Sequence, residues 1–95
     1  MAAYVIADLE VTDPAKFSEY RSQVSPTLEE YGGKYIVRGG ATEKAEGNWE
    51  PSRIVIIEFE SMERAKRWYN SKKCRGPMQL RHQSANTNFL FVEGV

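Results

Sequence analysis

An arginine beside two glycines is the first candidate for chemistry in this 95-residue chain. Arg38 precedes Gly39-Gly40, and glycines next to an arginine let a ligand approach the backbone and the guanidinium together. The planar guanidinium fork suits carboxylates, because it donates two parallel hydrogen bonds. The structural alternative, which we favour for Arg38, is an ion pair with Glu58 or Asp8. All three side chains are kept as candidates for a ligand site.

Trp49 and Arg53 flank Pro51 just before an apolar run. An indole near a guanidinium could stack on a ligand. A tryptophan in such a loop more often packs against the rim of a fold, and we favour that role. Both residues nevertheless remain ligand-binding candidates.

No catalytic residue can be assigned, and His82 and Tyr69 are the two candidates. His82 is the only histidine and could act as a base near neutral pH. It lies in the polar stretch LRHQSAN without an orienting partner, so we expect a solvated surface residue. Tyr69, like Tyr20, could donate a hydroxyl hydrogen bond. Both tyrosines follow helical spacing, however, and helical aromatics usually belong to the core.

Cys74 is the only cysteine, so an intrachain disulfide is impossible. Its neighbours Lys72, Lys73 and Arg75 are expected to lower the pKa of the thiol and to raise its reactivity. No histidine adjoins it to act as a base, so we expect an incidental thiol. One histidine with scattered carboxylates predicts no metal site, and we expect no cofactor.

Local patterns predict where the first elements begin and end. Alternation of apolar residues over 3–11 predicts a strand. Asp13 as cap and Pro14 at the first helical position predict a helix, which Gly32-Gly33 should end. Pro26 lies inside this helix and cannot donate a backbone bond, so a kink is expected there.

The remaining segments complete a β-α-β-β-α-β order. We expect strands at 34–38, 53–59 and 87–92, an irregular strand and loop over 41–52, a helix from the cap Ser61 to about 70, a basic loop at 71–76, and a helical turn or two over 77–85. This order predicts one ferredoxin-like α+β domain over residues 1–95, a four-stranded antiparallel sheet with two helices on one face.

The apolar runs predict burial on both faces of the sheet. In RIVIIEF, Val55 and Ile57 point one way while Ile54 and Ile56 point the other. We therefore predict a homodimer formed through the open sheet face. The alternative is that loops and the 77–85 segment cover this face. Asp8, Glu10 and Glu58 share the face, so the space between two sheets could be a wet, polar-lined cavity that holds a ligand.

From end to end, the chain resembles the family called domain of unknown function 1330, within the dimeric α+β barrel superfamily. The matching pieces are YVIADLEVTDP (4–14), EYR (19–21), YGGKYIVRGG (31–40), GNWEPSRIVIIEF (47–59), the pattern of Ala65, Trp68, Tyr69 and Ser71, and the closing FVEGV. The resemblance implies a ferredoxin-like protomer and a face-to-face dimer. Related barrels include cofactor-free monooxygenases, lactone isomerases and haem-dependent enzymes, so the fold does not choose an activity.

The chain departs from this family after Ser71. The family usually continues with proline, an acidic residue and tyrosine, whereas this chain has Lys72, Lys73 and Cys74. Arg81 falls where the family tends to keep an arginine, while His82 matches no family position. A family site that used residues 72–76 would therefore be altered here.

Composition limits the classes of function. Thirteen basic and thirteen acidic residues cancel, which argues against a broad nucleic-acid or anionic-lipid surface. RIVIIEF also lacks the aromatic pattern of an RNA-recognition motif. With no signal peptide and no apolar run long enough for a membrane helix, we expect a cytoplasmic protein.

Two hypotheses about function remain. The first is a homodimer that binds a small, anionic metabolite in the inter-sheet cavity, with cofactor-free monooxygenase or isomerase activity left open. The second is a non-catalytic dimeric structural or interaction module, which a dry and filled space between the sheets would favour.

Overall fold

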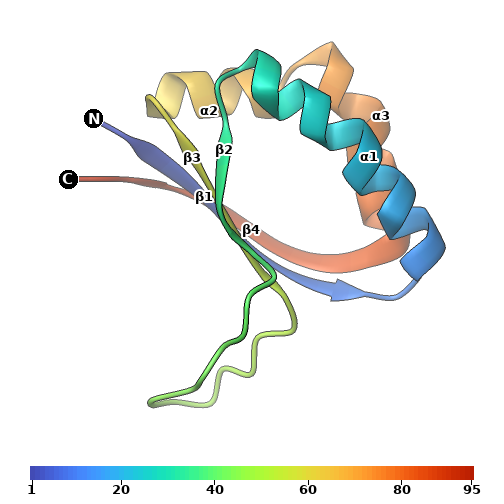
Figure 1. Cartoon of the computed structure of the whole chain (residues 1–95), viewed down its shortest axis with the longest axis vertical. Coiled ribbons are helices and arrows are strands. Elements are labelled where there is room, and N and C mark those ends of the chain that lie inside the picture. The colour runs from blue at the N-terminus through green and yellow to red at the C-terminus, as the bar shows by residue number, and fades with distance from the viewer.

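The computed structural model describes residues 1–95, and it confirms the ferredoxin-like α+β fold. The elements are β1 (Ala3–Val11), α1 (Pro14–Glu30), β2 (Lys34–Arg38), β3 (Ile54–Phe59), α2 (Met62–Tyr69), α3 (Lys72–Ser84) and β4 (Ala85–Glu93). The strands form one antiparallel sheet in the order β2-β3-β1-β4. All the helices lie on one face of this sheet (Figure 1).

Helix α1 begins and ends where the sequence predicts. The Asp13 side chain accepts a hydrogen bond from the Lys16 backbone N–H, and Pro14 follows it as the first helical residue. Gly32 adopts a φ of 75°, and the N–H groups of Gly32 and Gly33 close the last turn on Glu29 and Leu28. The helix continues through Pro26 to Glu30, so this proline does not end it. The kink expected at Pro26 stays a prediction.

Helix α3 corrects two predictions. Residues 71–76 are not a loop, because Ser71 caps a helix by accepting a hydrogen bond from the Cys74 backbone N–H. That helix runs to Ser84 and gives the protein three helices instead of two. Gly76 and Pro77 suggest a break, but burial at spacings of three and four outweighs them. The buried residues of α3 are Cys74, Pro77, Arg81 and Ser84.

Residues 41–52 also differ from the prediction, because no strand forms between β2 and β3. The chain leaves the end of β2 as a long loop that projects away from the body of the protein (Figure 1). The segment is polar and contains Gly47, which has a φ of 90°. Without an apolar stripe it has no surface to bury against the sheet, so it stays irregular.

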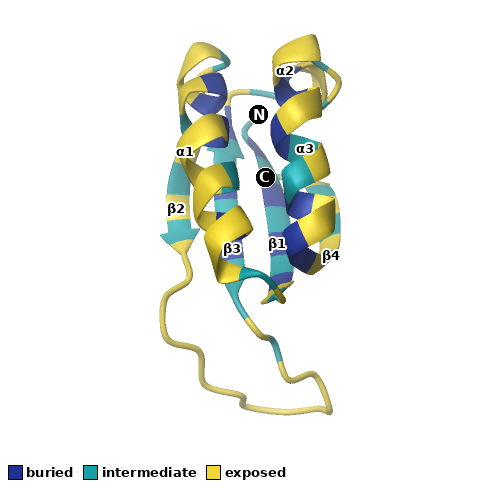
Figure 2. Ribbon diagram, turned by 90° about the vertical axis from the view of Figure 1, so that its right-hand side faces the viewer, coloured by how far each residue is buried: buried dark blue, intermediate teal, exposed yellow.

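The core lies between the helices and the sheet. Alternate residues of β1 and β3 are buried (Figure 2). They belong to one core cluster with Leu28 of α1 and Trp68 of α2. The Trp68 indole N–H donates to the Thr27 hydroxyl at 3.0 Å, which satisfies the one polar atom of this buried ring. The inward residues of β1 and β3 are Ala3, Val5, Ala7, Leu9, Val55, Ile57 and Phe59.

The opposite face of the sheet is apolar and uncovered by helices. Ile6 lies opposite both Ile56 of β3 and Leu90 of β4, and Leu90 is 52% exposed. Helix α3, which contains most of the 77–85 segment, packs on the other face and therefore does not cover these residues. The two-sided apolar character predicted for the sheet is confirmed. No helix of the chain is long and apolar enough to cross a bilayer.

Candidate functional site

A β-bulge in β2 determines which face of the sheet Arg38 uses. Tyr35 pairs with Ile57, but the register then shifts, and Val37 pairs with Ile56. The extra residue is Ile36. After the shift Arg38 lies opposite Val55, a residue of the helix face, so its side chain points toward the helices.

This placement corrects the expected ion pair of Arg38. Glu58 and Asp8 lie on the open face, and neither forms an ion pair with Arg38. The guanidinium instead lies over the ring of Tyr35, with its Cζ atom 4.7 Å from the ring centroid. The arginine is therefore free of a carboxylate partner within the protomer.

Arg53, the residue just before β3, reaches the same layer. Its Cζ atom lies 5.8 Å from the ring centroid of Phe17 on α1. Gly39 makes room for this path, because a Cβ atom at that position would lie 2.6 Å from the Arg53 Cζ atom. Gly39 also adopts a φ of 70°, which few other residues tolerate. Gly39 thus accommodates a second arginine beside Arg38.

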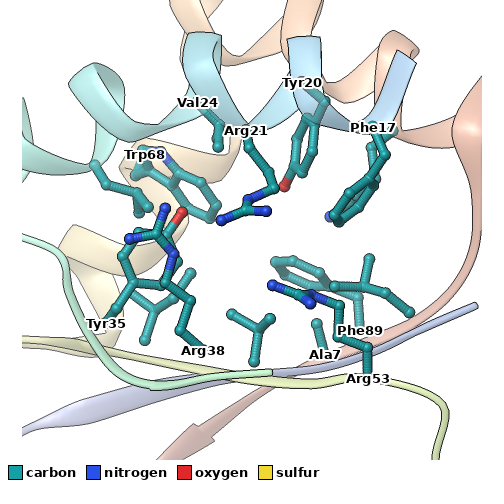
Figure 3. A pocket seen from close by; sticks show the side chains of 15 residues that line it. Ala7, Phe17, Tyr20, Arg21, Val24, Tyr35, Arg38, Arg53, Trp68 and Phe89 are labelled. Atoms are coloured by element: carbon teal, nitrogen blue, oxygen red, sulfur yellow. The ribbon is translucent and has the colours of Figure 1, made fainter. Parts of the chain in front are cut away.

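These side chains line a cavity between α1 and the sheet, which we call the arginine pocket (Figure 3). Its volume is about 30 Å³, room for about two water molecules. Arg21 from α1 and Arg53 from the sheet extend their guanidinium groups toward each other across it. The lining residues are Ala7, Leu9, Phe17, Tyr20, Arg21, Val24, Leu28, Tyr35, Arg38, Arg53, Val55, Ile57, Trp68, Arg81 and Phe89.

The positive charge of this pocket has no counter-charge in the protomer. Four arginines line it, and no aspartate or glutamate does. Every ion pair of the protein uses another cation: Lys44, Arg64, Arg67 or Lys73. Such an arrangement favours an anionic occupant, since unbalanced charge next to apolar walls is costly.

Arg81 is the most deeply buried of the four arginines. It is 4% exposed, and its Cζ atom lies 4.7 Å from the ring centroid of Phe89. The Nε–H groups of Arg81 and Arg53 are both buried without a hydrogen-bond partner. In folded proteins, the great majority of buried hydrogen-bond donors have a partner. Two unpaired guanidinium donors beside one cavity therefore point to a missing acceptor.

Two tyrosine side chains add hydroxyl groups to the lining of the pocket. Burial raises the pKa of Tyr20 to about 12, although the nearby Arg81 guanidinium acts in the opposite direction. Tyr20 is thus protonated at neutral pH and can donate a hydrogen bond to an anion. Tyr35 contributes from β2, beneath Arg38.

Asp8 and Trp49 belong to the other side of the sheet. The Asp8 carboxylate accepts hydrogen bonds from the Trp49 indole at 3.0 Å and from the backbone N–H groups of Ser52 and Arg53 at 2.9 and 3.3 Å. Desolvation alone would raise the pKa of Asp8, but these hydrogen bonds together lower it. Trp49 is 61% exposed. The indole and the Arg53 guanidinium therefore do not form one stacking site.

The two catalytic candidates lie outside the pocket lining. His82 is exposed on α3, as expected for a solvated residue. The Tyr69 ring is half-buried and packs edge-on against Phe91, with centroids 5.5 Å apart. Glu58 lies on the open face opposite Lys34 in the strand register. Functional roles for these three residues stay predictions.

Cys74 corrects the expected thiol chemistry. Its side chain is 3% exposed, and burial raises the pKa of the thiol in spite of the Arg81 charge. The neighbouring Lys73 points outward and binds Glu30 at 2.9 Å. Basic residues adjacent in sequence therefore do not activate this thiol.

Arg21 and Arg81 are the charged pocket residues that the sequence pattern does not mark as site candidates, and Tyr35 is a further polar one. Arg21 follows Tyr20 in a helical stripe otherwise read as core. Arg81 recurs with Cys74 and Pro77 at spacings of four and three, which could have marked it as inward-facing. No group of three or more histidine, cysteine, aspartate or glutamate side chains is arranged to hold a metal ion.

Solved structures share this fold at low sequence identity. A protein of unknown function from Rhodopseudomonas palustris superposes with a TM-score of 0.80 at 14% identity, covering 99% of this chain and 82% of that one. A dimeric ferredoxin-like protein of unknown function from a Jannaschia species gives 0.73 at 10%, covering 99% and 100%. SnoaB, a cofactor-independent oxygenase from Streptomyces nogalater, gives 0.69 at 10%, covering 99% and 92%.

The comparison with curated proteins finds no match. The sequence profile of one family matches residues 2–95, nearly the whole chain, in agreement with the resemblance seen in the sequence. The chain therefore belongs to the family described as Domain of unknown function (DUF1330).

Proposed function

We propose that the protein is a homodimer in which each protomer binds a compact anionic metabolite, bearing a carboxylate or a similar oxyanion, in the arginine pocket. The observation that supports this proposal is the pair of buried Nε–H groups on Arg81 and Arg53, which have no acceptor in the protomer. Planar guanidinium groups match oxyanions through paired hydrogen bonds.

The burial of Arg81 explains why an anion would bind here. Removing a charge from water without a partner costs several kcal/mol, roughly, even after the protein relaxes. A bound oxyanion supplies both the missing charge and the missing acceptors. Tyr20 adds a neutral donor from the same wall.

The size of the pocket limits how the ligand enters. A volume of about 30 Å³ accommodates an acid group beside Arg81 but not a whole metabolite. Arg21 and Arg38 are exposed, so these long side chains can move and admit the rest of the ligand between α1 and β2. We therefore propose that the acid group binds deepest and that the remainder faces the solvent.

This location replaces the inter-sheet cavity expected from sequence. The arginines and the carboxylates expected to share one cavity lie on opposite faces of the sheet. Asp8, Glu10 and Glu58 on the open face would repel an anion, whereas the helix face offers four cations. A ligand with negative charge is thus better accommodated within each protomer than between two protomers.

The open sheet face supports the homodimer. Its apolar side chains include Ile36 at 51% and Leu90 at 52% exposure. Ile56, Ile6 and Leu90 lie side by side across three strands, and soluble monomers rarely expose such a contiguous apolar patch. A twofold contact would bury this patch against a copy of itself. The dimeric Jannaschia protein has the same fold, which agrees with this arrangement.

The proposal stops at binding, because the pocket lining holds no side chain suited to act as a base. It contains no carboxylate, histidine or thiol. The Tyr20 hydroxyl, with a pKa of about 12, is a poor base at neutral pH. SnoaB shares the fold at 10% identity, and fold alone does not transfer its oxygenase activity.

Titration of the arginine side-chain signals tests the proposal directly. Acetate, succinate and inorganic phosphate are added separately to the ¹⁵N-labelled protein at constant ionic strength, and the Nε–H resonances of Arg81 and Arg53 are followed. We expect saturable shifts with at least one anion. Arg53→Gln should weaken its affinity by about tenfold or more, because one charge-assisted hydrogen bond is lost.

Arg67→Gln provides the matched control. Arg67 is exposed on the outer side of α2 and pairs with Glu63, so this variant removes one guanidinium without touching the pocket. Its anion affinity should equal that of the wild type. If none of the three anions shifts the Arg81 and Arg53 signals of the folded protein, the proposed function is wrong.

A further inference from the structure

We infer that Asp8 is a positioning residue for the anion site, acting through Arg53 from the opposite face of the sheet. This inference depends on the proposed function, since it concerns one of the two guanidiniums that would bind the anion. Asp8 does not line the arginine pocket. It acts on the site through the backbone of Arg53, whose side chain does line the pocket.

The contact of Asp8 with the backbone of Arg53 has a defined geometry. One carboxylate oxygen, Oδ1, accepts from the backbone N–H groups of Ser52 and Arg53 at 2.9 and 3.3 Å. The Arg53 carbonyl accepts from the backbone N–H of Leu9 at 2.9 Å. Two adjacent residues of β1 therefore hold the amide and the carbonyl of Arg53.

The Arg53 side chain depends on this support because little else holds it. It forms no ion pair, and its Nε–H has no partner. Its guanidinium packs near the Phe17 ring and beside the backbone of Gly39, and no hydrogen bond or ion pair directs it. The direction of the side chain is consequently set by the direction of its Cα–Cβ bond.

The direction of the Arg53 Cα–Cβ bond depends on how well the end of the adjoining loop is fixed. Arg53 is the last residue of the long connection between β2 and β3, and regular strand structure begins only at Ile54. Long connections are mobile, and their ends are fixed only where hydrogen bonds hold them. Asp8 supplies three such bonds, including the one from the Trp49 indole within the loop. Without them the strand end would fray, and Arg53 would leave the pocket.

The two oxygens of Asp8 allow the contributions to be separated. Asp8→Ala removes all three hydrogen bonds, whereas Asp8→Asn keeps one acceptor oxygen for the backbone N–H groups of Ser52 and Arg53. Trp49→Phe removes only the bond to Oδ2. If Arg53 is positioned through its backbone, Asp8→Ala should impair anion binding, and Asp8→Asn and Trp49→Phe should leave it nearly unchanged.

The expected sign of the change in anion affinity distinguishes positioning by Asp8 from a simple electrostatic effect. Removing a negative charge makes the protein more positive and should strengthen the binding of an anion. Positioning predicts the opposite result for Asp8→Ala. Glu10→Ala is the matched control, because Glu10 lies two residues away on the same face and binds only Asn86, at 2.9 Å. The anion affinity of Glu10→Ala should equal that of the wild type or be slightly higher.

A double-mutant cycle tests whether Asp8 acts through Arg53. The dissociation constant for inorganic phosphate is measured for the wild type, Asp8→Ala, Arg53→Gln and the double variant, together with each unfolding midpoint in urea. We expect Asp8→Ala to weaken binding by about tenfold in the wild type and to have no further effect in Arg53→Gln. If Asp8→Ala does not fold, Asp8→Thr replaces it, since threonine retains strand propensity with a shorter side chain.

The outcomes distinguish this inference from the proposed function. If the wild type binds phosphate and Arg53→Gln weakens this binding but Asp8→Ala does not, the inference about Asp8 is wrong. The proposed anion site in the arginine pocket is then still supported. Equal effects of Asp8→Ala in both backgrounds would also overturn it, because Asp8 would then act independently of Arg53. If phosphate binds the wild type but Arg53→Gln has no effect, Arg53 is not part of the site and Asp8 has nothing to position.

Discussion

Replacing Arg81 with methionine should make the anion-free protein more stable, although it removes the deepest cation of the proposed site. Arg81 is 4% exposed, has an unpaired Nε–H and has no carboxylate partner. Methionine fills a similar volume, is unbranched, and needs no hydrogen bond. The substitution therefore removes a desolvated charge while it preserves the packing against Phe89.

The expected size of the effect follows from two opposing contributions. Replacing buried charged groups with apolar groups of similar volume is neutral or stabilises proteins by roughly 1–4 kcal/mol. Loss of the contact between Arg81 and the Phe89 ring offsets about 1–2 kcal/mol of this gain. A net gain of about 1 kcal/mol remains, which corresponds to a rise in Tm of roughly 4–8 °C for a domain of this size.

Urea unfolding with chloride as the only small anion measures this difference, and a second series adds the anion that binds the wild type. At one hundred times its dissociation constant the anion should stabilise the wild type by roughly 2.7 kcal/mol. It should not stabilise Arg81→Met, so the order of the two stabilities should reverse. Arg67→Met, at an exposed helical ion pair, should change stability by less than about 0.5 kcal/mol in both series.

A loss of stability in the anion-free protein would refute this reasoning. If Arg81→Met lowered the free energy of unfolding by more than about 1 kcal/mol, Arg81 would be compensated within the protomer. The pocket would then be a structural feature, and the main support for anion binding would be lost. Unchanged or increased stability agrees with a site that is balanced only when it is occupied.

Three further predictions concern pH, thiol chemistry and assembly. The pKa of Tyr20 is raised from 10.0 to about 12 in the folded state, so its contribution to stability is full below pH 10 and is lost between pH 10 and 12. Tyr20→Phe should reduce the alkaline loss of stability by at most about 2–3 kcal/mol in urea unfolding; an unchanged profile would contradict the burial of this hydroxyl. Cys74 should react with a thiol reagent at least about 100-fold more slowly when folded than in urea, since its thiol is buried. Equal rates would contradict that burial. Ile56→Lys should give a folded monomer in sedimentation velocity while the wild type sediments as a dimer, whereas a monomeric wild type at micromolar concentration would disprove the open-face contact.

Much of the fold could be predicted because local patterns and global packing agree. The strict alternation in β1 and β3 predicts which residues occupy each face of these strands, and the structure confirms which of them are buried. Asp13 and Ser61 cap helices where their short polar side chains precede an apolar stripe. Gly32 ends α1 for the steric reason that glycine alone enters positive φ without strain.

The remaining parts depend on contacts between distant segments. Residues 72–76 look like a loop because Gly76 and Pro77 disfavour a helix, yet burial of Cys74 and Arg81 against the core maintains one. The bulge at Ile36 arises from the pairing of β2 with β3, and no residue of β2 predicts it. The candidate site is predictable only in part for the same reasons: the sequence marks Arg38 and Arg53, but it indicates neither the face they occupy nor their helical partners.

The bulge in β2 also has a consequence for insertions and deletions in this family. A strand alternates its side chains strictly, so one extra residue acts like a frameshift for everything that follows it. A variant that lacks Ile36 would have no extra residue to absorb: Val37 would follow Tyr35 directly and pair with Ile56, and Arg38 would stay opposite Val55, facing the helices. A single-codon deletion at the bulge would thus leave this cation beside the ligand, whereas a regular β2 that kept Ile36 would turn it toward the face where two subunits should meet.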